Sequence, residues 1–179
     1  MHEVMEPPEG HEGHESNPLV LPVAVTLAIL AVMVAMVTLL GHRASTEEII
    51  LQAQANDQWA YYQAKNSRSH EMQGVSDILG TLAPVDKQKT EVLREKYAKE
   101  SERYEKEKDE ASEKAKDYEK EKELIGRRGD RFDAAEVLLE IALIICSLTL
   151  LTKKRIFWMA SIGLGIFGIA VALSGFLLG

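Results

Sequence analysis

The stretch DAAEVLLEIALIICSLTLL, residues 133–151, decides how the chain folds. Its uninterrupted apolar part, residues 141–151, covers about 11 positions, or roughly 16 Å of helix, which is too short for a bilayer core of about 30 Å. The helix reaches a sufficient length only if it begins near Ala134 and includes Glu136 and Glu140. We therefore expect residues 134–151 to form a membrane span that carries two carboxylates near one end.

Two cleaner apolar segments lie on either side of this stretch. Residues 18–40 and 156–178 contain no charge over about 23 positions each, more than the roughly 20 that a spanning helix needs. The segment before the first span is acidic and has no Lys or Arg, and the apolar run is long, so we do not expect a cleaved secretory signal. The expected plan is an acidic, His-containing, disordered tail (1–17), spans over 18–42, 134–151 and 156–178, and a basic loop (152–155).

The segment between the first two spans, residues 43–133, is charged and helical in pattern. Gly and Pro gather at 74–84, which predicts a turn between two arms of about 35 to 45 residues, each roughly 50 to 70 Å long. A seven-residue rhythm after the turn predicts half of an apolar seam: Tyr97, Tyr104, Ala111, Tyr118 and Ile125. We expect an all-α membrane protein with a coiled-coil-like antiparallel hairpin outside the bilayer. A disordered charged linker is the alternative, which the regular tyrosine spacing disfavours.

Composition excludes several functions. The net charge of −7 and the even mixture of Lys and Glu leave no basic face, so no nucleic-acid partner is expected. Cys146 is the only cysteine, which rules out an intramolecular disulfide and a multi-thiolate metal site. No nucleophile–base pair or phosphate-binding loop occurs, so we expect no enzyme activity and no cofactor.

Small side chains form regular rows in the spans. Because lipid gives no hydrophobic reward for pairing two helices, close approach through small residues drives their association. We therefore expect packing rows and a homo-oligomer in the lipid bilayer, and whether the rows meet within or between chains stays open. The rows are Ala24, Ala28, Ala31 and Ala35 in the first span, and Ser161, Gly165, Gly168, Ala172 and Gly175 in the third.

The charged ends of the first two spans form the main candidate site. His42 and Arg43 end the first span on the same surface where Asp133, Glu136 and Glu140 begin the second. Charges near hydrocarbon are better paired than alone. We expect Arg43 to pair with Glu136 or Glu140, with His42 as a neighbour. Structural docking of the two spans is the first interpretation, and proton or cation handling is the second.

Two weaker groups stand outside this cluster. Asp57, Trp59, Tyr61 and Tyr62 either pack the base of the hairpin or form a surface for a protein partner or a lipid headgroup. The tail histidines His2, His11 and His14 are weak metal candidates without a regular element to hold their spacing, so no metal site is predicted.

The stretches GHRASTEEIILQAQANDQWAYYQAK (41–65) and RRGDRFDAAEVLLEIALIICSLTLLTKKRIFW (127–158) resemble an uncharacterised bacterial membrane family of the domain-of-unknown-function type. The resemblance implies a bacterial inner membrane and supplies no catalytic residues. The basic 152–155 loop is short, so the positive-inside rule predicts a cytoplasmic loop and a periplasmic hairpin. The opposite orientation is favoured by the arginines that flank the hairpin: Arg43, Arg127, Arg128 and Arg131.

The leading functional hypothesis is a membrane-anchored helical stalk that oligomerises and presents its hairpin to a protein partner. The alternative is a small oligomeric channel or transporter accessory with Glu136 and Glu140 at its mouth.

Overall fold

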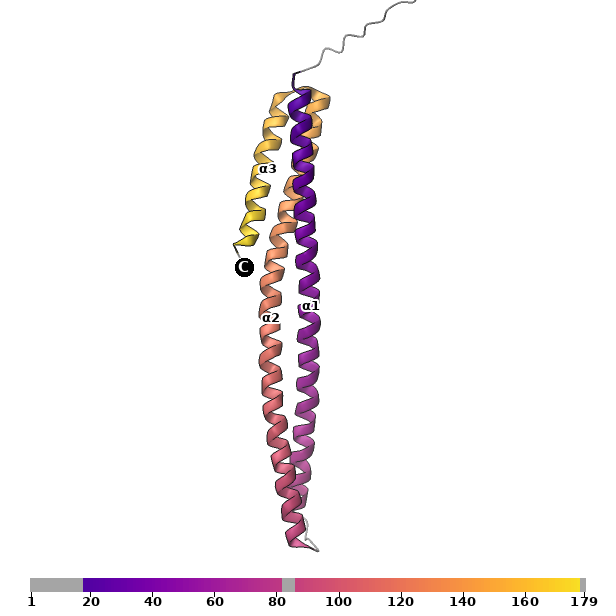
Figure 1. Cartoon of the computed structure of the whole chain (residues 1–179), viewed down its shortest axis with the longest axis vertical. Coiled ribbons are helices and arrows are strands. Elements are labelled where there is room, and N and C mark those ends of the chain that lie inside the picture. The colour runs from indigo at the N-terminus through magenta and orange to yellow at the C-terminus, as the bar shows by residue number, and fades with distance from the viewer. Residues whose placement is uncertain (1–17, 82–85, 178–179) are drawn as a thin grey trace, which may run out of the picture.

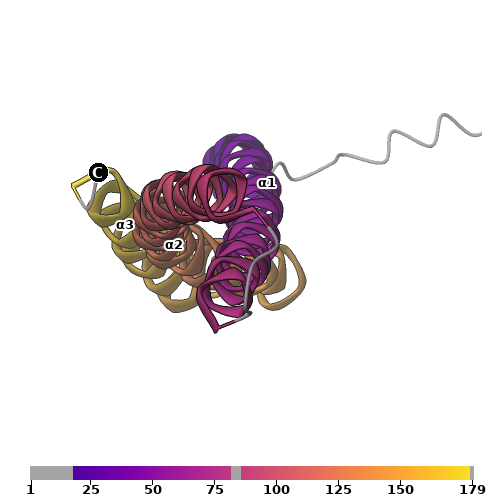
Figure 2. The same cartoon turned by 90° about the horizontal axis from the view of Figure 1, so that it is seen from below.

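The computed structural model describes residues 18–81 and 86–177 and is built from three helices. They are α1 (Val20–Thr81), α2 (Lys87–Thr152) and α3 (Arg155–Phe176), and no strand occurs among the described residues. Helices α1 and α2 lie antiparallel along their whole length, while α3 folds back beside the apolar end of α2 (Figure 1). Seen along the rod, α2 lies between α1 and α3 at the end where the three helices run together (Figure 2). The all-α prediction is confirmed.

The helices are long because the chain lacks interruptions. No proline occurs between Pro22 and Pro84, so the first apolar segment continues into the first hairpin arm as one helix. Asp86 caps the start of α2, where its side chain accepts a hydrogen bond from the backbone N–H of Lys89 at 3.2 Å. Lys153 ends α2 in a left-handed conformation with φ of 56°, and its N–H donates to the carbonyl of Thr149.

The turn of the hairpin is shorter than the sequence predicts. Helix α1 continues through Gly74 and Gly80 to Thr81, and α2 begins at Lys87. A glycine inside a helix costs only about 1 kcal/mol relative to alanine, which packing along a long partner helix offsets. The prediction of a disordered tail over 1–17 falls outside the described residues.

The apolar ends of the three helices pack through regular rows. Helix α1 buries Val23, Leu30 and Val37, which are spaced seven residues apart. Helix α2 buries a row with the same spacing: Phe132, Leu139 and Cys146. This spacing keeps one face of each helix on its partner. All three helices are long and apolar enough to cross a membrane.

The core of the hairpin differs from the predicted tyrosine seam. Of the predicted seam, Ala111 and Ile125 are buried, whereas Tyr97, Tyr104 and Tyr118 are only half-buried. Most of the other buried positions along the hairpin carry small side chains: Ala55, Ser69 and Ser76 on α1, and Ser101 and Ala115 on α2. Ser101 Oγ donates to the carbonyl of Ser69 at 3.1 Å, so the two helix backbones approach closely at this level. A tyrosine ring at the centre would hold the helices further apart, so the rings lie on the flank instead.

Candidate functional site

Glu136, at the start of the apolar part of α2, contacts a hydroxyl of α1 and not the expected cation. Thr38 Oγ1 lies 2.7 Å from Glu136 Oε1 and donates to it, and the same oxygen lies 3.0 Å from the Val34 carbonyl. The single hydroxyl proton of Thr38 is therefore shared between two acceptors. Glu136 is half-buried at this contact, which connects α1 to α2 near the end of their apolar segments.

The expected ion pair between Arg43 and Glu136 or Glu140 is not formed within one chain. Over residues 18–81 and 86–177, no carboxylate lies at ion-pair distance from Arg43. Antiparallel register explains the difference. Arg43 lies five residues, roughly 7.5 Å, beyond Thr38 toward the hairpin, where α1 faces earlier residues of α2. Gly129, for example, lies against Ala44.

The other members of the predicted cluster are spread along the two helices. Asp133 lies against the bare backbone of Gly41, because a Cβ built there would be 2.9 Å from Asp133 Oδ1. His42 is exposed, and its carbonyl accepts a hydrogen bond from Thr46. Glu140 is exposed one helical turn from Glu136, within the apolar segment of α2. The structure thus brings together Glu136 with Thr38 and Asp133 with Gly41, and separates both from Arg43.

The two predicted rows of small residues differ in burial. The α3 row is buried against α2 and Leu30: Ser161, Gly165, Gly168, Ala172 and Gly175. A Cβ on Gly168 would lie 3.1 Å from Leu139 Cγ, so contact is already close. The α1 row of Ala24, Ala28, Ala31 and Ala35 is exposed on the single chain. We call this row the outer face of α1, together with the exposed Ile49 and Ile50 that continue it toward the hairpin.

The aromatic group near Asp57 forms a polar connection across the hairpin. Trp59 Nε1 donates to Glu119 at 2.8 Å, and the Trp59 ring packs edge-on against Tyr62 with centroids 5.5 Å apart. Tyr61 donates to Glu107 at 3.5 Å, and Asp57 lies beside it on the edge of a cleft of about 340 Å³. Three of the four residues thus contact the opposite arm or one another, as hairpin packing would require.

Acid should destabilise the hairpin, because several of its carboxyls accept hydrogen bonds from cations. The bond from Lys65 lowers the pKa of Glu107 below its ordinary 4.5, and the pKa values of Glu105 and Glu123 are lowered likewise, first by Lys108 and Arg127. A lowered folded-state pKa contributes stability that is complete above pH 4.5 and is lost as pH falls through the lowered values.

We therefore expect a lower thermal midpoint at about pH 3 than at pH 7 by circular dichroism, with each exposed pair contributing little. Lys65→Gln should reduce the difference between the two midpoints. Equal midpoints for the native chain at the two pH values would refute this explanation.

A cleft beside Arg43 was not foreseen. Arg43 and Glu47 of α1 and Arg128 of α2 line a space of about 210 Å³ together with Leu40, Ala44, Ile125 and Phe132. The Arg128 guanidinium lies over the rings of Phe176 at 5.0 Å and Phe132 at 5.7 Å, and its buried Nε has no hydrogen-bond partner among residues 18–81 and 86–177. We call this space the arginine cleft. The sequence shows both arginines as flanking charge, but only the register of α1 on α2 brings them together.

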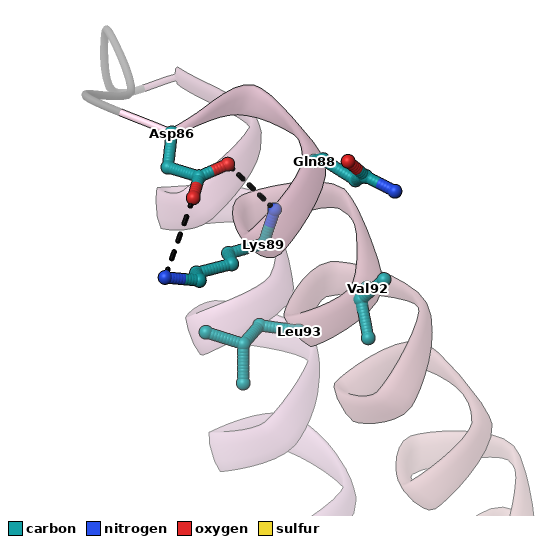
Figure 3. A pocket seen from close by; sticks show the side chains of 5 residues that line it. All are labelled: Asp86, Gln88, Lys89, Val92 and Leu93. Atoms are coloured by element: carbon teal, nitrogen blue, oxygen red, sulfur yellow. Dashed lines mark hydrogen bonds and ion pairs between the residues drawn. The ribbon is translucent and has the colours of Figure 1, made fainter.

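The far end of the hairpin carries a second, more open cleft of about 530 Å³ (Figure 3). Asp86 and Lys89 form an ion pair on its wall, and Val92 and Leu93 supply apolar surface. Val92 is 63% exposed, and Ile78 on α1 is 58% exposed. The hairpin therefore ends in apolar side chains that the described residues leave uncovered.

No group of three His, Cys, Asp or Glu side chains that could hold a metal occurs in the part of the chain that the structure describes. His2, His11 and His14 lie outside it.

These features define a class: an all-helical protein with three helices long and apolar enough to cross a membrane, two of which continue into a hairpin. The chain belongs to the family described as Domain of unknown function (DUF4337), which matches residues 21–178. The predicted resemblance to a family of unknown function is thereby confirmed. No curated protein and no solved structure matches the chain.

Proposed function

We propose that this protein is a non-enzymatic, membrane-anchored helical stalk of the bacterial inner membrane. It associates with further copies through the outer face of α1 and presents the hairpin to a protein partner. The observation that carries this proposal is the exposure of that outer face, which runs from the apolar segment into the hairpin. The partner's place is the apolar tip near Val92.

Within the apolar segment, the outer face consists of small side chains. Ala24, Ala28, Ala31 and Ala35 are exposed because α2 and α3 pack on other sides of α1. A lipid-facing helix gains nothing from small residues, whereas a helix partner can approach closely over them. The face therefore suits a second copy better than it suits lipid.

The same face continues outside the apolar segment with water-exposed isoleucine. Ile49 lies two heptads after Ala35 on the same side of the helix and is 70% exposed, and Ile50 beside it is 52% exposed. An isoleucine in water loses about 1.5 to 3 kcal/mol relative to a buried one. A second copy that covers the alanines would also reach Ile49, which gives both features one cause.

The stalk places its tip far from the membrane. Helix α1 continues for about 38 residues beyond Arg43, or roughly 57 Å. The short basic loop 152–155 favours a cytoplasmic loop and a periplasmic hairpin. Thiol labelling of a Gln88→Cys variant by an impermeant reagent in cells with an opened outer membrane would support this orientation, and protection from the reagent would reverse it.

Association is tested by mass measurement of the purified chain in detergent. The native chain should be an oligomer, and Ala31→Phe should weaken it by at least about tenfold, because a ring on the close-approach face separates the helices. Val32→Phe, at a position that is 60% exposed but off the alanine row, should leave the mass unchanged. A native chain that is monomeric at all concentrations would end the proposal.

The alternative is a small oligomeric channel or transporter accessory with Glu136 and Glu140 at its mouth. One observation favours it: Glu140 is an exposed carboxylate on the apolar segment of a single chain. Such a group requires water or a polar partner between copies. This function would be established by ion flux through liposomes that contain the oligomer, if Glu140→Gln abolishes the flux. The absence of ion flux with the native chain would exclude it.

A further inference from the structure

We propose that the arginine cleft binds one phospholipid headgroup, with the phosphate between Arg43 and Arg128 and the primary ammonium of an ethanolamine group on Glu47. The inference rests on the proposed membrane placement but not on oligomerisation. It assigns a ligand to a cleft that the proposed stalk function does not use.

The cleft lies at the level where headgroups would be. Phe176, the last residue of α3, packs edge-on against Phe132 with ring centroids 5.3 Å apart, and Phe132 is part of the cleft wall. The third apolar helix therefore ends beside the cleft, and α3 spans about 33 Å from there to Arg155. Leu40, the last apolar residue before His42, also lines it. Acyl chains could follow the apolar surface below while the headgroup enters the cleft.

The cationic groups of the two arginines are not neutralised by a carboxylate of the described residues. Arg127 binds Glu123 and Arg103 binds Glu100 and Glu107, whereas neither Arg43 nor Arg128 has an ion pair among the described residues. The rings of Phe132 and Phe176 hold the Arg128 guanidinium beside the cleft, and its buried Nε has no acceptor in the described part of the chain. Arginine donors match phosphate oxygens in geometry and charge. A phosphate oxygen could supply the acceptor that Nε lacks.

Glu47 indicates which kind of phospholipid headgroup the cleft binds. It lines the same cleft and forms no ion pair among the residues described here. A site for phosphate alone would gain nothing from a carboxylate, which repels the anion. Two guanidinium groups and one carboxylate complement a headgroup that carries a phosphate and an ammonium with hydrogen-bonding protons. A quaternary choline group has no such protons, and a glycerol group has no positive charge.

The experiment is lipid binding by the purified full-length chain, measured by native mass spectrometry in detergent. The probes are phosphatidylethanolamine, phosphatidylglycerol and phosphatidylcholine with the same acyl chains, and inorganic phosphate. We expect preferential binding of phosphatidylethanolamine and a loss of about tenfold in Arg43→Ala, as for one charge-assisted contact. Glu47→Gln should remove the preference for phosphatidylethanolamine over phosphatidylglycerol. Arg127→Ala, which changes a paired arginine outside the cleft, should behave as the native chain does.

Arg128 contributes to packing as well as to the cleft, so Arg128→Lys replaces a deletion. It keeps the charge but loses the fork of donors and should weaken binding without lowering the thermal midpoint. The inference is overturned if the four lipid and phosphate probes bind the native chain alike. It is also overturned if Arg43→Ala binds as the native chain does, or if inorganic phosphate binds and the lipids do not. An unchanged oligomer mass in Arg43→Ala would separate this outcome from failure of the association proposal.

Discussion

Replacing Gly168 by leucine should detach α3 from α2 and lower the thermal midpoint of the chain in detergent. At Gly168, a Cβ would already lie 3.1 Å from Leu139 Cγ, 3.2 Å from Leu139 Cδ2 and 3.3 Å from Leu138 Cβ. Leu139 is completely buried and cannot move aside without opening the core around it. Overpacking of this kind costs about 1 to 3 kcal/mol, and a whole leucine side chain belongs at the upper end of that range.

Gly163→Leu provides the control. Apart from its chain neighbours and the backbone of its own helix, no atom of the described residues lies within 4 Å of a Cβ built at Gly163, although this glycine is in the same helix and the same apolar segment. The control therefore adds the same side chain, with the same helix propensity and hydropathy, to an open position. We expect its thermal midpoint to equal or exceed that of the native chain. Equal midpoints for Gly168→Leu and Gly163→Leu would show that α3 does not depend on close contact at Gly168.

Phe132→Ala should have the largest effect of any single truncation near the arginine cleft. Phe132 is 1% exposed and contacts elements from all three helices: the backbone at Gly41, the Phe176 ring and the Arg128 guanidinium. Truncation of a buried phenylalanine costs about 3 to 5 kcal/mol in protein cores. Apolar solvent could fill part of the cavity, so we expect about 3 kcal/mol here, measured by chemical denaturation in mixed micelles.

Phe167→Ala is the matched control, because Phe167 is 58% exposed on the apolar segment of α3. Its truncation removes an equal side chain from a position that is mostly exposed. We expect a change within about 0.5 kcal/mol. If Phe167→Ala were as damaging as Phe132→Ala, the stability would come from the lipid-facing surface, and the packing of α3 on α2 would contribute little.

The failure of the predicted Arg43 pair has an instructive cause. The sequence predicts that the acids of residues 133–140 and the cations at 42–43 lie where the first two spans meet the hairpin, and these residues fall inside the continuous helices α2 and α1. A helix advances about 1.5 Å per residue, so an error of four or five residues in register moves a charge by more than an ion-pair distance. The register follows from the buried rows of α1 and α2, where Val23 lies opposite Cys146 and Ala44 opposite Gly129.

The rows of small residues also show a difference between what the sequence suggests and what the packing of the helices decides. The sequence presents the alanines of the first span and the glycines of the third as equivalent candidates for packing. In the structure α3 buries its row on α2, and α1 contacts α2 with the larger Val23, Leu30 and Val37 instead. The outer face of α1 is left for the proposed second copy. Shape complementarity among three helices decides this, and periodicity within one helix cannot.

The amino-acid pattern by itself determined the helical class, the three apolar segments and a hairpin between the first two, because periodicity, charge content and helix breakers act locally. Only the tertiary structure decided which residues meet: Thr38 with Glu136, Phe132 with Phe176, and Arg43 with Arg128 across one cleft. The physical reason is that such contacts depend on the axial offset of packed helices. That offset is set by the sum of many small packing contacts along the rod, so no single sequence motif predicts it.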